Sequence, residues 1–211
     1  MKLLILGILL TYLSCDYQYT ITKWQDGIVP YYIQGDFTDS EMKLLKDSMK
    51  KWESVCNVKF TETSPRSNAY KIMKGELWYS TIGESMDFKY MVFGNPVEER
   101  HILHELAHCL GFLHEHQRAD RNKYINIIWE RVNPSATTDF TIHNNPLYNE
   151  ESFNYDFDSI MHYHGTAFST DGKPTITAYD GRELKINKEI SDTDKKKAVL
   201  IYGEVVEDKD I

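Results

Sequence analysis

The sequence predicts an α+β fold in which strands and long helices fill the first half and an irregular second half ends in a helix. Two observations predict it. Apolar residues recur at helical spacing over 42–52 and 103–110, and short apolar runs typical of strands lie at 28–33 and 56–61. The segment 133–155, rich in Asn, Pro and Thr, predicts a loop. The 211 residues suffice for one domain, or for two small lobes that share a cleft.

The first long helix is predicted between the strands Ile28–Ile33 and Cys56–Thr61. Thr38 predicts its N-terminus, because Glu41 stands three residues later at the position of a capping box. Apolar side chains then follow on one helical face, which we expect to pack on the core: Met42, Leu45, Met49 and Trp52.

A second helix is predicted to end at Gly111, because glycine readily adopts the left-handed conformation that closes a helix. Asn95 can cap its start, Pro96 fits its first turn, and Glu98 stands at the capping-box position. One face of this helix is apolar and should pack on the core: Leu103, Leu106, Ala107 and Leu110.

The last predicted helix begins at Ser191, with Asp194 at the capping-box position, and ends at Gly203. Its apolar residues should dock on the core: Ala198, Leu200 and Ile201.

The run from His104 to His114 predicts a zinc site. His104 and His108 lie four residues apart, so both imidazoles can point at one ion from the same helical face. After the turn at Gly111, His114 supplies a third nitrogen and leaves one tetrahedral position open for water. Glu105 can hold that water as a general base without ligating the metal. These residues predict one Zn²⁺ per chain and hydrolysis of peptide bonds by a zinc-bound water that Glu105 activates.

Around this run the chain resembles the astacin family of metzincin zinc metalloproteases. The similar segments are Trp24–Tyr31, Glu115–Arg121, Asp156–Tyr163, Ala167–Ser169 and Gly172–Ile176, so the likeness covers nearly the whole chain after the first fifteen residues. It implies a metzincin-like protease domain over 16–203. Such a domain has a small mixed sheet and long helices in an upper lobe, an irregular lower lobe with a C-terminal helix, and a cleft between them.

The resemblance also assigns residues near the metal. It implies that Met161 lies beneath the ion and that Tyr163 donates its phenolic hydrogen to the oxyanion. Members of the family are typically made as zymogens whose freed N-terminus folds inward to meet the glutamate that is Glu115 here. The match at Trp24 places that N-terminus at about Cys15 or Asp16, so we expect signal removal itself to free it, with no propeptide needed. The alternative from the residues themselves is that Glu115 is solvated or pairs with Arg118 or Arg121.

Residues 1–15 are predicted to be a signal peptide, because Lys2 precedes an apolar run from Leu3 to Leu13 that is short for a membrane span. Secretion is therefore expected; an uncleaved anchor, or a lipid anchor at Cys15, is the alternative. Residues 204–211 form an acidic tail, predicted to be solvated.

The cysteines depart from the family pattern, which has two disulfides. Only Cys15, Cys56 and Cys109 occur. Neither disulfide of the family is therefore expected, and Cys109 is predicted to be a buried apolar side chain rather than a ligand. The fold should depend on packing and the metal.

The net charge of the chain limits the kinds of partner that can be expected. A net charge of −8 argues against nucleic acid and against an anionic membrane surface. Protein or peptide substrates are expected, and the resemblance implies a preference for an acidic residue after the cut. Candidate cations for that preference are Lys173, Arg182 and Lys185, although a solvated face explains them equally well. The alternative functions are a catalytically weak zinc-binding module that recruits a protein partner through the same cleft, and an adhesion protein with structural zinc.

Overall fold

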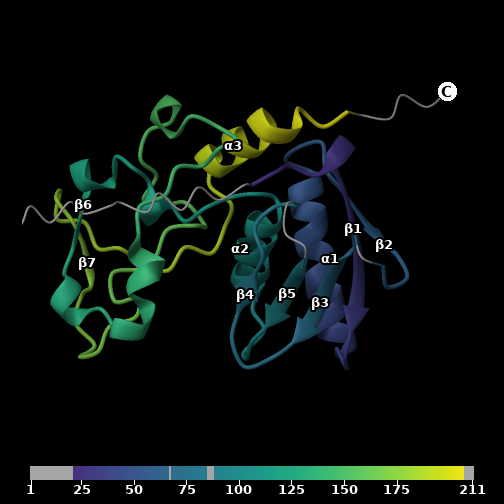
Figure 1. Cartoon of the computed structure of the whole chain (residues 1–211), viewed down its shortest axis with the longest axis horizontal. Helices are drawn as coiled ribbons and strands as arrows, with labels where there is room; N and C mark the ends of the chain where they lie inside the picture. The colour runs from purple at the N-terminus through teal and green to yellow at the C-terminus, as the bar shows by residue number, and fades with distance from the viewer. Residues whose placement is uncertain (1–20, 67, 85–87, 207–211) are drawn as a thin grey trace, which may run out of the picture.

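The computed structural model describes residues 21–66, 68–84 and 88–206. Figure 1 shows these residues in two halves. One half holds a sheet and the helices α1 (Asp39–Glu53) and α2 (Glu99–Cys109). The other joins β6 (Ile125–Ile127) and β7 (Ile176–Ala178) to short 3₁₀ turns and irregular segments, and α3 (Asp192–Tyr202) lies along the top of the view. The predicted α+β class, with its irregular second half, is confirmed.

The sheet of the first half is mixed, as predicted. Its strands lie in the order β2-β1-β3-β5-β4, with β4 antiparallel at one edge and the other pairs parallel. Their bounds are β1 (Ile28–Gln34), β2 (Lys59–Glu62), β3 (Tyr70–Lys74), β4 (Tyr79–Ser80) and β5 (Tyr90–Phe93). The predicted strand at 56–61 begins three residues late, because Cys56 still donates its backbone N–H to Trp52 O (3.2 Å) in the turn that closes α1.

The capping boxes of α1 and α3 are confirmed. The Thr38 hydroxyl accepts the Glu41 backbone N–H, and the Glu41 carboxylate accepts that of Thr38 at 2.7 Å. Ser191 and Asp194 repeat this exchange at the start of α3. These bonds satisfy N–H groups that a helix leaves without partners at its first turn.

The predicted start of α2 is wrong. The cis peptide bond between Asn95 and Pro96 lies outside the helix, which begins at Glu99. Glu98 is the N-cap residue, but its carboxylate accepts a hydrogen bond from Arg100 Nε (2.7 Å) rather than from the backbone of the first turn. The helix therefore begins without a side-chain cap.

Two tryptophans attach α2 to the rest of the first half. Trp52 on α1 is fully buried, and its Nε1 donates to Leu103 O at 3.1 Å. Trp24 is also buried and donates from Nε1 to Cys109 O at 2.8 Å, at the far end of the helix. Each bond satisfies an indole N–H while its ring fills the core, so the position of α2 is fixed near its middle and at its C-terminal end.

The core includes most of the predicted apolar faces. Leu45, Met49 and Trp52 of α1 and all four predicted residues of α2 are buried. In α3, Ala198 and Ile201 are buried, but Leu200 is 58% exposed and its predicted docking is wrong. A smaller apolar cluster holds the second half together: Ile125, Ile127, Val132, Phe140, Tyr155, Ile176, Ala178 and Leu184.

Two of the three cysteines lie in the described part of the chain. Cys56 and Cys109 are both buried and form no disulfide with one another, and Cys109 packs in the core as an apolar side chain, as predicted. Cys15, the predicted signal peptide and residues 207–211 of the predicted tail lie outside the described residues. Among the helices that are described, none has the length and apolarity to cross a membrane.

Replacing Trp52 by alanine is expected to lower the free energy of unfolding by about 3–5 kcal/mol, because it opens a cavity between α1 and α2 and removes the indole hydrogen bond to Leu103 O. Urea unfolding of the full chain measures this. Phe88→Ala is the control, since that ring is 77% exposed and its loss should change the same free energy by less than about 0.5 kcal/mol. Equal stability of Trp52→Ala and wild type would contradict the attachment of α2 described above.

Candidate metal centre

Helix α2 and the turn after it bring the three predicted histidines together. His104 and His108 lie one turn apart on α2. Gly111 then adopts a φ of +98°, as the helix-end prediction requires, and a Cβ at this position would lie 2.5 Å from Leu147 Cδ1. Both the backbone conformation and the close contact therefore favour glycine here. The reversed chain carries His114 back toward the first two rings.

The imidazole Nε2 atoms converge on one point. His104 Nε2 and His108 Nε2 each lie 3.1 Å from His114 Nε2, and one ligand atom from each ring falls within 4.8 Å of the others. Zn–N bonds of about 2.0–2.1 Å in a tetrahedral site place such nitrogens roughly 3.4 Å apart. The spacing therefore fits zinc, and the predicted ligand set is brought together.

Each Nδ1 atom is held from behind by an acceptor. His104 Nδ1 donates to Ile160 O and His108 Nδ1 donates to Phe112 O, both at 2.8 Å. A carbonyl oxygen can only accept, so the proton of each ring is on Nδ1 and the lone pair on Nε2 faces the metal position. Such bonds fix the orientation of metal-binding histidines.

The third ring has a side-chain partner that the sequence analysis missed. His114 Nδ1 lies 3.1 Å from Oε1 of Gln117, which is itself buried. The Gln117 Nε2 atom donates to Asp139 O at 3.0 Å, which identifies Oε1 as the acceptor that faces His114. In the sequence, the only sign of this role is that Gln117 lies three residues after His114, the third histidine of the triad.

Burial keeps the three rings neutral. Desolvation lowers the pKa of His104 to about 4 and that of His108 to about 3, and it lowers the pKa of His114 well below its usual value. Three neutral rings with their Nε2 lone pairs turned inward repel one another unless a cation lies between them. The donor set therefore fits a nitrogen-preferring divalent ion such as Zn²⁺.

Glu105 extends into the same cavity. It is 5% exposed, and its buried Oε2 has no hydrogen-bond partner. Desolvation raises the pKa of this carboxyl group to about 8. A buried carboxylate oxygen without a partner beside a metal-binding triad has the position that a water or a substrate group would occupy.

Tyr163 lies beside the triad, as the resemblance implies. Its ring stacks on His116, with centroids 4.0 Å apart, and lies 4.5 Å from the His114 ring. Burial raises the pKa of the Tyr163 phenol, so it keeps its proton at neutral pH. Met161 is buried in the core that includes α2, and its carbonyl accepts the backbone N–H of Glu115 at 3.0 Å. Its place beneath the metal stays a prediction.

Two cavities meet at the triad, of about 320 and about 490 Å³. His104, Glu105 and Tyr163 line both, so they lie at the centre of one continuous cleft. The larger cavity also includes His108 and His114. Both are lined from α2 on one side and from the irregular half on the other.

Two further histidines lie nearby without joining the triad, as predicted. His101 stacks on Trp78, with ring centroids 4.6 Å apart. His162 is buried and uses Nε2 to bond the Tyr155 hydroxyl at 2.9 Å. Its Nδ1 bonds Tyr163 O at 2.6 Å, so it holds the backbone next to the phenol.

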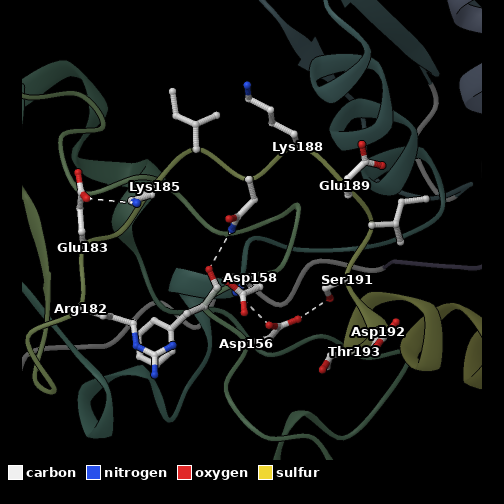
Figure 2. A pocket seen from close by; sticks show the side chains of 14 residues that line it. Asp156, Asp158, Arg182, Glu183, Lys185, Lys188, Glu189, Ser191, Asp192 and Thr193 are labelled. Carbon is white, nitrogen blue, oxygen red and sulfur yellow. Dashed lines mark hydrogen bonds and ion pairs between the residues drawn. The ribbon is translucent and has the colours of Figure 1, made fainter.

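The three cations proposed from the sequence lie away from the triad. Figure 2 shows Arg182 and Lys185 on a third cavity, of about 860 Å³, which shares Ile186 and Asn187 with the smaller cavity of the cleft. Lys185 pairs there with Glu183. Arg182 pairs with Asp180, and Lys173 is exposed and lines neither cavity of the cleft. None of the three lines the two cavities that meet at the triad, and their part in specificity stays a prediction.

Arg100 is a candidate cation for substrate specificity that the sequence did not suggest. It is the only lysine or arginine among the described residues that line the two cavities of the cleft, and it lies in the smaller one. Its Nε donates to the exposed carboxylate of Glu98.

Glu115 is neither solvated nor paired with Arg121. It is 2% exposed, and its Oε1 accepts from Arg118 Nη1 at 2.9 Å, which is one of the predicted pairings. Arg121 donates instead to the carbonyls of His116 and Phe140. Pairing with a freed N-terminus concerns residues outside the described ranges and stays a prediction.

Comparison with known proteins agrees with this site. The family model described as Astacin, a family of peptidases, matches residues 16–203. The chain belongs to the astacin family. It is similar to zinc metalloproteinase nas-6 of Caenorhabditis elegans (33% identity, 82% of this chain and 55% of that protein). It is also similar to an astacin-like metalloendopeptidase of Gallus gallus (31% identity, 85% of this chain and 45% of that protein).

Among solved structures, the fold is similar to that of high choriolytic enzyme 1, a hatching enzyme zinc-protease from Oryzias latipes. The TM-score is 0.78 at 25% identity, over 87% of this chain and 94% of that one. The chain spans about half the length of the curated relatives it matches. The family match confirms the predicted membership, the zinc cofactor and the metzincin-like fold.

His114→Ala is expected to lose most of the bound zinc, because two nitrogens are fewer than the three protein ligands of a catalytic zinc site. Elemental analysis of the dialysed protein measures this. His164→Ala is the control, since His164 lies outside the triad and should leave the zinc content unchanged. Full zinc occupancy in His114→Ala would remove the third ligand.

Glu105→Gln is expected to stabilise the metal-free protein at pH 8 but not at pH 4. The folded-state pKa of Glu105 is raised from 4.5 to about 8, so its contribution to stability is present below pH 4.5 and is lost as the pH rises toward 8. Glutamine removes this loss. Thermal unfolding of chelator-treated protein between pH 4 and 8 measures it; a constant difference between variant and wild type would contradict the raised pKa.

Proposed function

We propose that this chain is a zinc-dependent endopeptidase that cleaves peptide bonds in proteins or peptides. One observation carries the proposal: Glu105 presents an unpartnered carboxylate oxygen in the cavity where three neutral histidines converge. A structural zinc site normally closes its coordination with a fourth Cys or His. Among the described residues, the group that could hold a metal is formed by His104, His108 and His114 alone, and Cys109 packs in the core.

Bound zinc would supply a Lewis acid that polarises a carbonyl and acidifies water. The three histidine Nε2 atoms would hold it. Glu105 takes a proton from the water that attacks the peptide carbonyl and transfers it to the departing amine. A carboxylate that accepts a proton in the first step can release it in the second.

Tyr163 would donate to the oxygen on which negative charge develops. Its phenol keeps its proton because burial raises its pKa, and stacking on His116 restricts its ring. A hydrogen-bond donor already positioned near a developing oxyanion stabilises the transition state more than the substrate.

The alternative of a binding module without catalysis has less support. Such a module needs the histidines and the cleft, but it has no use for a buried carboxylate with one oxygen, Oε2 of Glu105, that accepts no hydrogen bond from the protein. The comparisons also join the chain to proteins named as metalloproteinases.

Glu105→Ala is expected to keep zinc and fold while losing at least about 10²–10⁴-fold in casein cleavage, because it removes the proton carrier and no ligand. Tyr163→Phe should lose less, about 10²–10³-fold. Both are assayed on denatured casein, with and without a zinc chelator, and zinc content is measured in parallel. Wild-type turnover in Glu105→Ala, or cleavage that resists the chelator, would refute this mechanism.

We further propose that the smaller cavity favours an acidic side chain next to the cut bond. Arg100 supports this, because its guanidinium lines the cavity and its Glu98 partner is exposed to solvent, where such pairs contribute little. The family resemblance implies the same preference.

Arg100→Gln is expected to weaken the acidic preference about tenfold, as the loss of one charged hydrogen bond would. Cleavage of a proteome-derived peptide library by variant and wild type measures it. Lys173→Gln is the matched control, since that exposed cation lines neither cavity of the cleft. A wild-type library with no acidic preference would refute the proposal outright.

Secretion is proposed from the sequence of residues 1–15, which have the charge and apolar run of a signal peptide. N-terminal sequencing of protein from the culture medium tests it. Retention of residues 1–15 would contradict signal cleavage.

A further inference from the structure

Helix α3 carries two buried charged side chains three residues apart. Asp194 is fully buried and Lys197 is 1% exposed, whereas Lys195 and Lys196 between them face solvent. Lysine is almost never buried completely unless its charge is paired. The partners of these two residues therefore show what α3 does in the molecule.

Lys197 is directed at the residue that follows the last histidine of the triad. Its Nζ donates to Glu115 Oε2 at 2.6 Å, with both side chains 2% exposed. The rings of Tyr148 and Phe153 lie 5.6 and 5.9 Å from the ammonium, so aromatic faces enclose it. In this enclosure, Glu115 is the anion that balances Lys197.

The other carboxylate oxygen of Glu115, Oε1, also accepts hydrogen bonds. Oε1 accepts from Arg118 Nη1 and from the backbone N–H of Asp156, each at 2.9 Å. The backbone N–H of Glu115 donates to Met161 O at 3.0 Å. Side chain and main chain of Glu115 are thus both fixed, and His114 precedes it directly. Lys197 is the donor that holds Oε2 in this arrangement.

Asp194 reaches the backbone behind another ligand from the same helix. Its Oδ1 accepts from Ser159 Oγ at 2.7 Å, and its Oδ2 accepts from the backbone N–H of Ile160 at 2.8 Å. The carbonyl of Ile160 is the acceptor that orients His104. One helical turn of α3 therefore holds the backbone behind two different metal ligands.

We propose that Lys197 is a positioning residue of the metal centre. Its ammonium fixes the Glu115 carboxylate and thereby the backbone that places His114 against the two rings of α2. The inference rests on the proposed function for the identity of the metal, but it concerns the geometry of the ligands. It predicts that zinc affinity depends on a residue that touches neither the metal nor the substrate.

The test compares Lys197→Met with Lys196→Met, the same change at the exposed neighbouring position. Zinc dissociation constants come from competition with a chromophoric chelator, and kcat and KM come from a peptide assay. Lys197→Met should bind zinc about 10–100-fold more weakly, as loss of a partner behind the ligands does, while Lys196→Met matches wild type. In the zinc-saturated enzyme kcat should fall while KM stays within about twofold, since Lys197 lines neither cavity of the cleft.

A purely structural lysine would give a different result. Lys197→Met would then unfold at a lower temperature but keep wild-type zinc affinity and kcat, and this outcome overturns the proposal. If Lys197→Met does not fold, the double variant Lys197→Met, Glu115→Gln removes both charges of the pair, and wild-type zinc affinity in that variant overturns the proposal equally. A wild-type protein that binds zinc without cleaving peptides would refute the proposed function and leave the affinity comparison valid.

Discussion

The arrangement of this protein depends on three neutral imidazole nitrogens held face to face. Burial prevents protonation from relieving their mutual repulsion, so the rings hold this geometry only if each is restrained from its other side. The restraints come from three separate segments, at Phe112, Gln117 and Ile160. The fold must bring these segments together for the three rings to face one metal ion, and much of the architecture serves that requirement.

The two halves contribute to the cleft in different ways. The first half offers a regular helix whose carbonyls are bonded by Trp24 and Trp52, so two ligands stand on a rigid support. The second half has little regular structure, yet it must place Tyr163 and the carbonyl of Ile160 accurately. It does so through buried charged groups, because ionic hydrogen bonds are strong and directional where helices and strands are absent.

Most features set by neighbouring residues could be predicted from the sequence, although the local capping pattern misplaced the start of α2, and features set by distant residues could not. The capping boxes at Thr38 and Ser191 and the ligand spacing are local, and they were predicted correctly. Strands β3 and β4 are five and two residues long and depend on pairing across the sheet, so no run of apolar residues marks them, whereas the apolar run of β5 (Tyr90–Phe93) was not assigned to a strand. Leu200 was assigned to the core on hydrophobicity alone. Lys197 was overlooked because its burial follows from Glu115, 82 residues away.

The two buried cysteines have a consequence for how the first half is held together. Cys56 and Cys109 pack as apolar side chains, and burial raises the pKa of the Cys56 thiol to about 12, so it gives almost no thiolate. Within the described part of the chain, these two cysteines form no disulfide with each other. The first half therefore packs around these two thiols without a disulfide between them, and each stabilises the core only as an apolar side chain.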